Sequence, residues 1–302
     1  MNPILQFMHD DGRRRNADPN PKGRELERRK SMNTSIPEDI KTDLDVSYRT
    51  DHGSSLKCDI LMPKDSGEGR LPVMVVIHGG GLLFGNRKAN LPFRIKMAGF
   101  GYLVYCIEYR LLNEADFFGE LADINHGLQF VKDSLEKYNG DPERIYLTGE
   151  SAGGLLALYS VAMCGSETVR RQMGVFCPDI RVRGLILSSS MLYTNRFDYI
   201  AAVYKKDLYG KRTKDKEFME YMNPENPEVI KSLPKVCLIT GNGDFLRKVS
   251  LRYARALDKA GHPYLLLDYD TAKKLPHAFA TLVPMLKESS DAIDRMHAWN
   301  AR

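Results

Sequence analysis

Cysteine, tryptophan and long apolar runs are scarce in this sequence. Its 302 residues include five cysteines and one tryptophan. The cysteine count is odd and no Cys-x-x-Cys pair occurs, so neither a disulfide framework nor a zinc or redox motif is indicated. No run of about 18 apolar residues exists, and the first residues have neither the basic start nor the apolar core of a signal peptide. We therefore expect a reduced, cytoplasmic protein with no membrane partner, no metal and no cofactor.

The charge distribution argues against a nucleic-acid partner. The formal net charge of +5 is spread along the chain, and one concentration of basic residues lies at 205–216. A solvated surface explains that concentration better than a binding patch does. No basic stripe interleaved with aromatic residues occurs. With 43% apolar and 27% charged residues, the composition is that of an ordinary soluble globular protein.

Short apolar runs that alternate with helical patterns predict an α/β fold. Strands are expected at 46–49, 57–62, 72–77, 102–109, 144–148, 184–187, 236–240 and 264–269. Helical spacing of apolar residues predicts helices at 121–138, 152–163, 249–260 and 279–299. Because most strands are separated by helices, we expect a mostly parallel sheet with helices on both faces.

The predicted organisation is one catalytic domain with two accessory segments. Residues 1–45 are rich in charge, Asn and Pro, with one short helix expected at 23–32. A disordered tail or a cap over a site elsewhere would fit that segment equally well. Residues 46–302 are expected to form the α/β domain. A long interruption at about 191–232, before the strand at 236, is expected to form a lid.

A Gly-Glu-Ser-Ala-Gly pattern at 149–153 predicts a nucleophilic serine. If a strand ends and a helix begins here, Ser151 occupies a strained turn that raises its hydroxyl above the sheet. Glycine suits the positions two residues on either side because a side chain there would collide with the neighbouring strand or helix. A serine hydroxyl is a poor nucleophile, so it needs a base, an acid that orients the base, and donors for the oxyanion.

Residues at the carboxyl ends of later strands provide the two partners. Asp244 follows the strand at 236–240, and His277 follows the strand at 264–269. In open α/β sheets, functional groups gather at this edge, so both residues are expected near Ser151. Three other histidines fail this test: His126 and His297 lie within expected helices, and His262 precedes its strand.

The tetrapeptide His78-Gly79-Gly80-Gly81 follows an expected strand and supplies the missing donors. Backbone amides approach a substrate closely only where side chains are absent. We expect the amides of Gly80 and Gly81, together with that of Ala152, to form the oxyanion hole. A phosphate-binding role fits this tetrapeptide poorly, because no Lys-Ser/Thr follows the glycines as in a P-loop.

In these motifs, over about residues 55–300, the chain resembles the hormone-sensitive-lipase-like group of α/β-hydrolases. Those serine esterases carry an H-G-G-G loop, a G-D/E-S-A-G-G elbow, a D-x-L acid motif and an H-G/A-F histidine motif. The resemblance implies that residues 1–45 form an N-terminal cap, and it suggests a homodimer through the strand at 264–269. The chain departs from the usual pattern at Glu150, at Phe245, where proline is usual, and at Ala278.

The sequence thus predicts a serine carboxylesterase that acts on a small-molecule ester through an acyl-serine. Small or short acyl groups are favoured, since no large exposed apolar lid is evident. Leu82, Phe84 and Tyr193 could line an apolar pocket or belong to the core. Acetyl or feruloyl groups on plant oligosaccharides would need the same chemistry. A peptidase and a non-catalytic binding protein on the same fold are the remaining alternatives. Because the base must be neutral, activity is expected to decline as pH falls through about 6 to 7.

Overall fold

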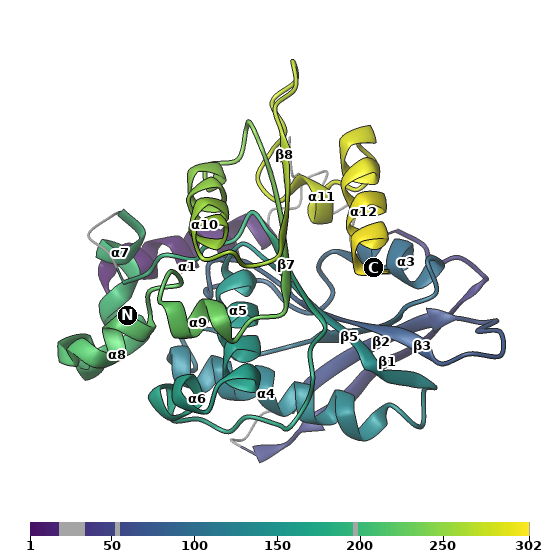
Figure 1. Ribbon diagram of the computed structural model, residues 1–302, viewed down its shortest axis with the longest axis horizontal. Helices are drawn as coiled ribbons and strands as arrows, with labels where there is room; N and C mark the ends of the chain where they lie inside the picture. The colour runs from purple at the N-terminus through teal and green to yellow at the C-terminus, as the bar shows by residue number, and fades with distance from the viewer. Residues whose placement is uncertain (18–33, 52–54, 196–198, 302) are drawn as a thin grey trace.

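The computed structural model describes residues 1–17, 34–51, 55–195 and 199–301. Within these ranges one sheet has the strand order β1-β2-β4-β3-β5-β6-β7-β8 (Figure 1). The strands are β1 (Ile40–Arg49), β2 (Leu56–Pro63), β3 (Leu71–Ile77), β4 (Leu103–Ile107), β5 (Gly140–Glu150), β6 (Gly184–Ser188), β7 (Lys235–Gly241) and β8 (Tyr264–Tyr269). Strand β2 pairs antiparallel with β1 and β4, and the other pairs are parallel. The predicted α/β class with a mostly parallel sheet is confirmed.

Strand β3 illustrates why the central strands are continuous apolar runs. Alternate side chains point to opposite faces of a sheet, so both sets must be apolar when helices cover both faces. Val73 and Val75 pack into the core on one face, whereas Met74 and Val76 pack into the core on the other. All four are buried.

Two sets of helices cover the two faces. On one face the core includes residues of α4 (Phe117–Ser134), α5 (Ala152–Gly165) and α10 (Arg247–Lys259). On the other it includes residues of α3 (Leu91–Gly99), α11 (Phe279–Leu282) and α12 (Lys287–Asn300), and Figure 1 shows α3 and α12 together. The expected single helix at 279–299 is therefore wrong. The break contains Pro284, which has no amide hydrogen to continue a helix.

The accessory segments pack against each other. Helix α1 (Pro3–Ala17) lies beside α7 (Tyr199–Tyr209), as Figure 1 shows. The side-chain amide of Asn2 donates to the carbonyl of Val203 at 2.6 Å, and the N-terminal ammonium lies 3.2 Å from Asp207. After α7 come η2 (Gly210–Lys214), α8 (Lys216–Tyr221) and α9 (Pro227–Lys231), and α6 (Glu167–Met173) lies earlier in the chain.

The N-terminal segment differs from the expectation at its end. Strand β1 begins at Ile40, so the last residues of the expected cap, 40–45, belong to the sheet. These residues are largely polar because β1 is an edge strand, and the ladder is irregular between Asp43 and Val46. The helix expected at 23–32 lies outside the described residues.

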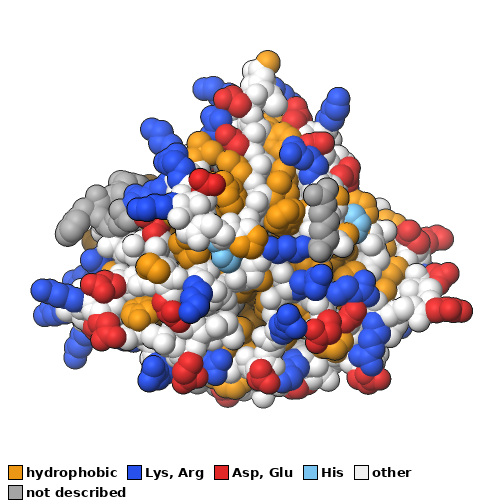
Figure 2. All heavy atoms as spheres, viewed as in Figure 1, with side chains coloured by type: hydrophobic (Ala, Val, Ile, Leu, Met, Phe, Trp, Pro, Cys, Tyr) orange, Lys and Arg blue, Asp and Glu red, His pale blue; other side chains and the backbone are white. Residues whose placement is uncertain are grey.

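The molecular surface has both signs of charge. Figure 2 shows lysine and arginine side chains interspersed with aspartate and glutamate over the face in view. This mixture agrees with a small net charge that is spread along the chain. None of the helices in the described ranges combines the length and apolar character needed to cross a lipid bilayer.

Candidate active site

Ser151 lies at the junction of β5 and α5 in a backbone conformation that few residues adopt. Its φ of 52° and ψ of −121° place it outside the regions that L-residues favour, and its amide donates to the carbonyl of Ser188 at 3.0 Å. Close packing explains the flanking glycines. A Cβ on Gly149 would lie 2.4 Å from the carbonyl oxygen of Gly153, and one on Gly153 would lie 2.4 Å from that of His78. The elbow therefore requires glycine at both positions.

Asp244 and His277 form a hydrogen-bonded pair. Nδ1 of His277 lies 2.7 Å from Oδ1 of Asp244. The same carboxylate accepts hydrogen bonds from the amide of Leu246 at 2.9 Å and from the hydroxyl of Thr240 at 2.8 Å. A carboxylate can only accept, so Nδ1 carries the proton and Nε2 is left as the basic nitrogen.

Electrostatics keep Asp244 ionised. Burial alone would raise the pKa of this carboxyl, but hydrogen bonding and charge attraction from His277 outweigh burial and lower the pKa. The amide of Leu246 lowers it further. An ionised acid beside the imidazole fixes its tautomer and stabilises the imidazolium that forms when the base takes a proton.

Two hydrogen bonds bring the histidine loop to the serine. The amide of Ala278, next to His277, donates to the hydroxyl of Ser189 at 3.0 Å. Ser189 follows β6, whose last residue accepts the amide of Ser151. The hydroxyl of Thr281 donates to Glu150, the residue before Ser151, at 3.1 Å. The structure thus gathers all three residues predicted for the triad at the carboxyl edge of the sheet.

The glycine loop after β3 has amides suited to an oxyanion. Gly80 and Gly81 have φ of 114° and 64°, in the region that favours glycine. The amide of Gly79 is occupied, since it donates to Oε1 of Glu150 at 2.9 Å. Within the described part of the chain, the amides of Gly80, Gly81 and Ala152 donate to no other protein group. These three are the amides expected from the sequence to hold the oxyanion.

Glu150 has a larger structural role than its sequence position indicates. Its buried carboxylate contacts the glycine loop through Gly79 and the histidine loop through Thr281. Burial raises the pKa of this carboxyl, although the hydrogen bonds and the nearby His277 oppose the rise. The only sequence signal for this role is the adjacency of Glu150 to the serine.

Of the three residues expected to line a pocket, two lie in the core and one lies against the N-terminal helix. Leu82 is fully buried in the core, and so is Tyr193, whose hydroxyl donates to Glu225 at 2.8 Å. Neither exposes surface to a substrate in this structure. Phe84 is half-buried beneath α1, where a Cβ on Gly12 would lie 2.7 Å from its ring. The N-terminal helix therefore covers the segment that follows the glycine loop.

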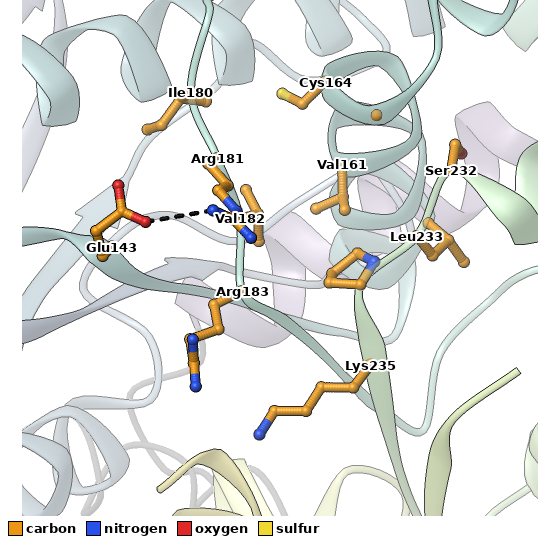
Figure 3. Close-up of a pocket in the computed structure, with 12 residues that line it drawn as sticks. Glu143, Val161, Cys164, Ile180, Arg181, Val182, Arg183, Ser232, Leu233 and Lys235 are labelled. Atoms are coloured by element: carbon orange, nitrogen blue, oxygen red, sulfur yellow. Dashed lines mark hydrogen bonds and ion pairs between the residues drawn. The ribbon is translucent and has the colours of Figure 1, made fainter. Parts of the chain in front are cut away.

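Figure 3 shows the residues that line a cavity of about 440 Å³. Its lining includes Arg183 and Lys235, which lie at the amino ends of β6 and β7. Among the described residues, no group of three or more His, Cys, Asp or Glu side chains could hold a metal ion.

Phe245 lies beside the candidate triad. The sequence marked it only as a departure from the acid motif of the family that the chain resembles. Its ring centroid lies 4.3 Å from that of His277, with an angle of 34° between the planes. The other histidines set aside earlier have different contacts: His126 stacks on Phe176, and His262 contacts the carbonyl of Pro234.

The chain matches one family model and is similar to curated proteins. The family model BD-FAE matches residues 58–259. A curated relative from Oryza sativa subsp. japonica, named probable isoprenylcysteine alpha-carbonyl methylesterase ICME, is 26% identical over 225 residues, which are 71% of this chain and 54% of the relative. The chain thus spans about half the length of that relative.

Solved structures share the fold over almost the whole chain. Esterase B from Lactobacillus rhamnosis, with a bound tributyrin phosphonate, has a TM-score of 0.86 at 21% identity and covers 100% of this chain and 96% of its own. Brefeldin A esterase, described as a bacterial homologue of human hormone-sensitive lipase, has a TM-score of 0.71 at 15% identity and covers 98% and 83%. These matches confirm the α/β-hydrolase fold that the motifs imply.

Proposed function

The chain belongs to the BD-FAE family, and from that premise we propose that it hydrolyses carboxylic esters through an acyl-serine intermediate. The observation that carries the proposal is the 2.7 Å hydrogen bond between His277 and Asp244, in a loop that is tied to the strand beside Ser151. It supports an imidazole whose Nδ1 hydrogen is held by the acid, which leaves Nε2 as the nitrogen that can act as a base toward a serine.

In this mechanism, His277 takes the proton of Ser151 as the serine oxygen attacks the ester carbonyl. Asp244 holds the imidazole in the required tautomer, and the amides of Gly80, Gly81 and Ala152 stabilise the oxyanion. The imidazolium then protonates the departing alcohol. Water, activated by the same imidazole, attacks the acyl-serine and releases the acid.

The direct test is Ser151→Ala with p-nitrophenyl butyrate. We expect turnover to fall to the rate of the uncatalysed reaction, because no other group can form the acyl intermediate. A fluorophosphonate probe should label the unaltered protein at Ser151 and leave the variant unlabelled. Unchanged turnover in the variant would refute the mechanism.

Short acyl groups are the substrates that this site favours in our proposal. The hydroxyl of Tyr204, from the lid helix α7, lies so near the glycine loop that a Cβ on Gly81 would be 2.8 Å from it. Helix α1 covers Phe84, as described above. We propose that helix α1 and the helices at 199–231 act as cap and lid and limit the space for the acyl chain. A series of p-nitrophenyl esters from acetyl to octanoyl, extended to acetylated sugars, tests this preference.

A peptidase or a non-catalytic binding protein would behave differently in the same assays. A peptidase would cleave a peptide amide at a rate comparable to that of the matching ester. A binding protein would leave the fluorophosphonate unreacted. The hydrogen-bonded acid and base support the catalytic alternative, because binding alone requires neither of them.

A further inference from the structure

Cys164 and Cys177 form a pair that their spacing in the sequence does not predict. Cys164 lies in the last turn of α5, and Cys177 lies in the loop after α6. Their Sγ atoms are 3.6 Å apart. The other cysteines, Cys58, Cys106 and Cys237, are free and buried in strands. The two sulfurs are in van der Waals contact, about 1.5 Å beyond the length of a disulfide bond.

The two thiols share a hydrogen bond and a nearby cation. The hydrogen bond with Cys164 lowers the pKa of the Cys177 thiol, against the effect of burial, and the Arg170 guanidinium lowers it further. The same hydrogen bond raises the pKa of the Cys164 thiol. Both sulfurs also face the carbonyl oxygen of Pro178, at 4.0 Å from Cys164 and 3.7 Å from Cys177. The Arg170 guanidinium acts on both thiols in the direction that favours the thiolate, which is the nucleophile, because it lowers the pKa of each.

The pair is open to small molecules from solvent. Both residues are only partly buried. Cys164 lines the cavity of about 440 Å³ beside Val161, as Figure 3 shows. A small hydroperoxide can enter a space of that size. The pair lies at the opposite end of α5 from Ser151, so its chemistry is separate from that of the candidate active site.

We propose that Cys164 and Cys177 are a hydroperoxide-reactive thiol pair that closes to an intrachain disulfide. The thiolate of one cysteine attacks a peroxide oxygen, the O–O bond breaks, and a sulfenic acid forms while the other oxygen leaves as an alcohol or water with a proton. The thiol of the other cysteine then attacks the sulfenic sulfur, the S–S bond forms, and water leaves with the hydroxyl group and the thiol proton. Two electrons pass from the two thiols to the peroxide.

The disulfide would fix the position of α6, which contacts the segment expected to form the lid. Residues 164–177 enclose α6, whose Gln172 donates to Glu217 of α8 at 2.7 Å. Arg212 of the lid donates to the carbonyl of Gln172 at 2.6 Å. A bond between the two cysteines ties this segment to α5. We therefore expect oxidation to raise the midpoint of thermal unfolding by several degrees, since closing the loop restricts the unfolded chain.

The test treats the folded, full-length protein with hydrogen peroxide, quenches with catalase and measures the intact mass after alkylation of free thiols. We expect a species with two of its five thiols unalkylated, and a peptide that joins Cys164 to Cys177. Dithiothreitol should reverse both results. Cys164→Ser should lose the cross-link and leave a sulfenic acid on Cys177 that dimedone traps.

The matched control is Cys106→Ser, which removes a buried cysteine and should retain the cross-link. Circular dichroism and the thermal midpoint establish that each variant is folded. No cross-link in the unaltered protein, a cross-link between two chains, or equal dimedone labelling of all five cysteines would overturn the proposal.

A second inference concerns Phe245 and rests on the proposed function. Phe245 follows the acid Asp244 and is 74% exposed, an unusual state for a phenyl ring beside a candidate active site. Its ring lies 4.3 Å from the imidazole of His277, whose side chain is only 17% exposed. The ring thus extends the surface of the imidazole outward to solvent.

The position of Phe245 beside His277 indicates that it borders the alcohol part of the substrate. The imidazole of His277 delivers a proton to the oxygen of the departing alcohol, so groups beside the imidazole border the alcohol part of the ester. We infer that Phe245 is a specificity-determining residue that favours esters whose alcohol carries an aromatic or other apolar ring. Contact between two such rings is favoured beyond simple burial of surface.

Benzyl acetate and ethyl acetate, which share the acyl group, test this assignment. Phe245→Ala should lower kcat/KM for benzyl acetate by about tenfold and leave that for ethyl acetate within about twofold. Phe245→Trp should retain the preference. The matched control is Phe176→Ala, which removes another exposed phenyl ring stacked on a histidine, His126, and should change neither value.

Two different failures can be told apart. An equal loss for both esters in Phe245→Ala would mean that the ring acts by positioning His277, and it would overturn the assignment to the substrate. If the unaltered protein hydrolyses neither ester and resists the fluorophosphonate, the proposed function itself fails.

Discussion

Oε1 of Glu150 accepts a hydrogen bond of 2.9 Å from the amide of Gly79, across 71 positions of the chain. The other carboxylate oxygen accepts from Thr281 in the histidine loop. One buried side chain thus joins the nucleophile elbow to the loops that carry the oxyanion donors and the base.

Replacement of Glu150 should reduce catalysis through geometry. In Glu150→Ala the amide of Gly79 loses its acceptor, and we expect kcat for p-nitrophenyl acetate to fall by about ten- to a hundredfold with a smaller change in KM. Glu150→Gln keeps an acceptor for Gly79 and should recover most of the rate. Equal losses in both variants would contradict a role that depends on the hydrogen bond.

Asp244→Asn should abolish most activity while the fold persists. An amide can donate to Nδ1 of His277 and so select the tautomer that cannot act as a base toward Ser151. By analogy with other Ser-His-Asp triads, kcat should fall by about 10³ to 10⁴. The control is Asp270→Asn, in the same loop as His277 and largely exposed, which should retain normal turnover. More than a tenth of normal kcat in Asp244→Asn would argue against this triad.

Gly80→Ala should damage both stability and turnover. A Cβ at this position would lie 1.9 Å from the carbonyl oxygen of Phe84, and the φ of 114° is strained for any residue with a side chain. The glycine loop must therefore shift, which moves the expected oxyanion donors. Gly69→Ala is the matched control, because nothing lies within 4 Å of an added Cβ there. We expect a lower thermal midpoint and at least about a hundredfold loss of kcat in Gly80→Ala alone.

Stability should fall at acidic pH partly because of His78. Burial lowers the pKa of this imidazole to about 4, although the hydrogen bond with the carbonyl of Gly79 opposes the shift. In the unfolded chain a histidine titrates near pH 6.5, so the unfolded state binds the proton first as pH falls. The contribution of neutral His78 is complete above about pH 6.5 and is lost as pH falls toward 4, at a cost of about 3 kcal/mol.

Urea unfolding at pH 7.5 and pH 4.5 measures this contribution. The difference in unfolding free energy between the two values should be smaller in His78→Gln, which has no titrating group at that position. The partly exposed His262 offers a control, and His262→Gln should keep the full difference. An unaltered pH dependence in His78→Gln would show that other groups cause the acid instability.

Local sequence patterns predicted much of the fold and the candidate triad. The apolar run at 72–77 has to be a strand covered on both faces, and it is β3. The motif around Ser151 predicts its own backbone, because only glycine at 149 and 153 permits the close contacts of the elbow. Asp244 and His277 could be identified as partners of Ser151 because residues that directly follow parallel strands lie at the same edge of the sheet.

Contacts between distant segments could be decided only by the tertiary structure. The two thiols of Cys164 and Cys177 meet because α6 folds back on α5, and no spacing rule encodes that turn. Leu82 and Tyr193 have the composition of a pocket or of a core, and packing places them in the core. A motif fixes the backbone conformation only within a few residues of itself. The sequence alone therefore determined the strained conformation of the serine and the chain order of serine, acid and base. Which side chains surround that serine depends on how separate helices and loops pack, and that was decided by the three-dimensional fold.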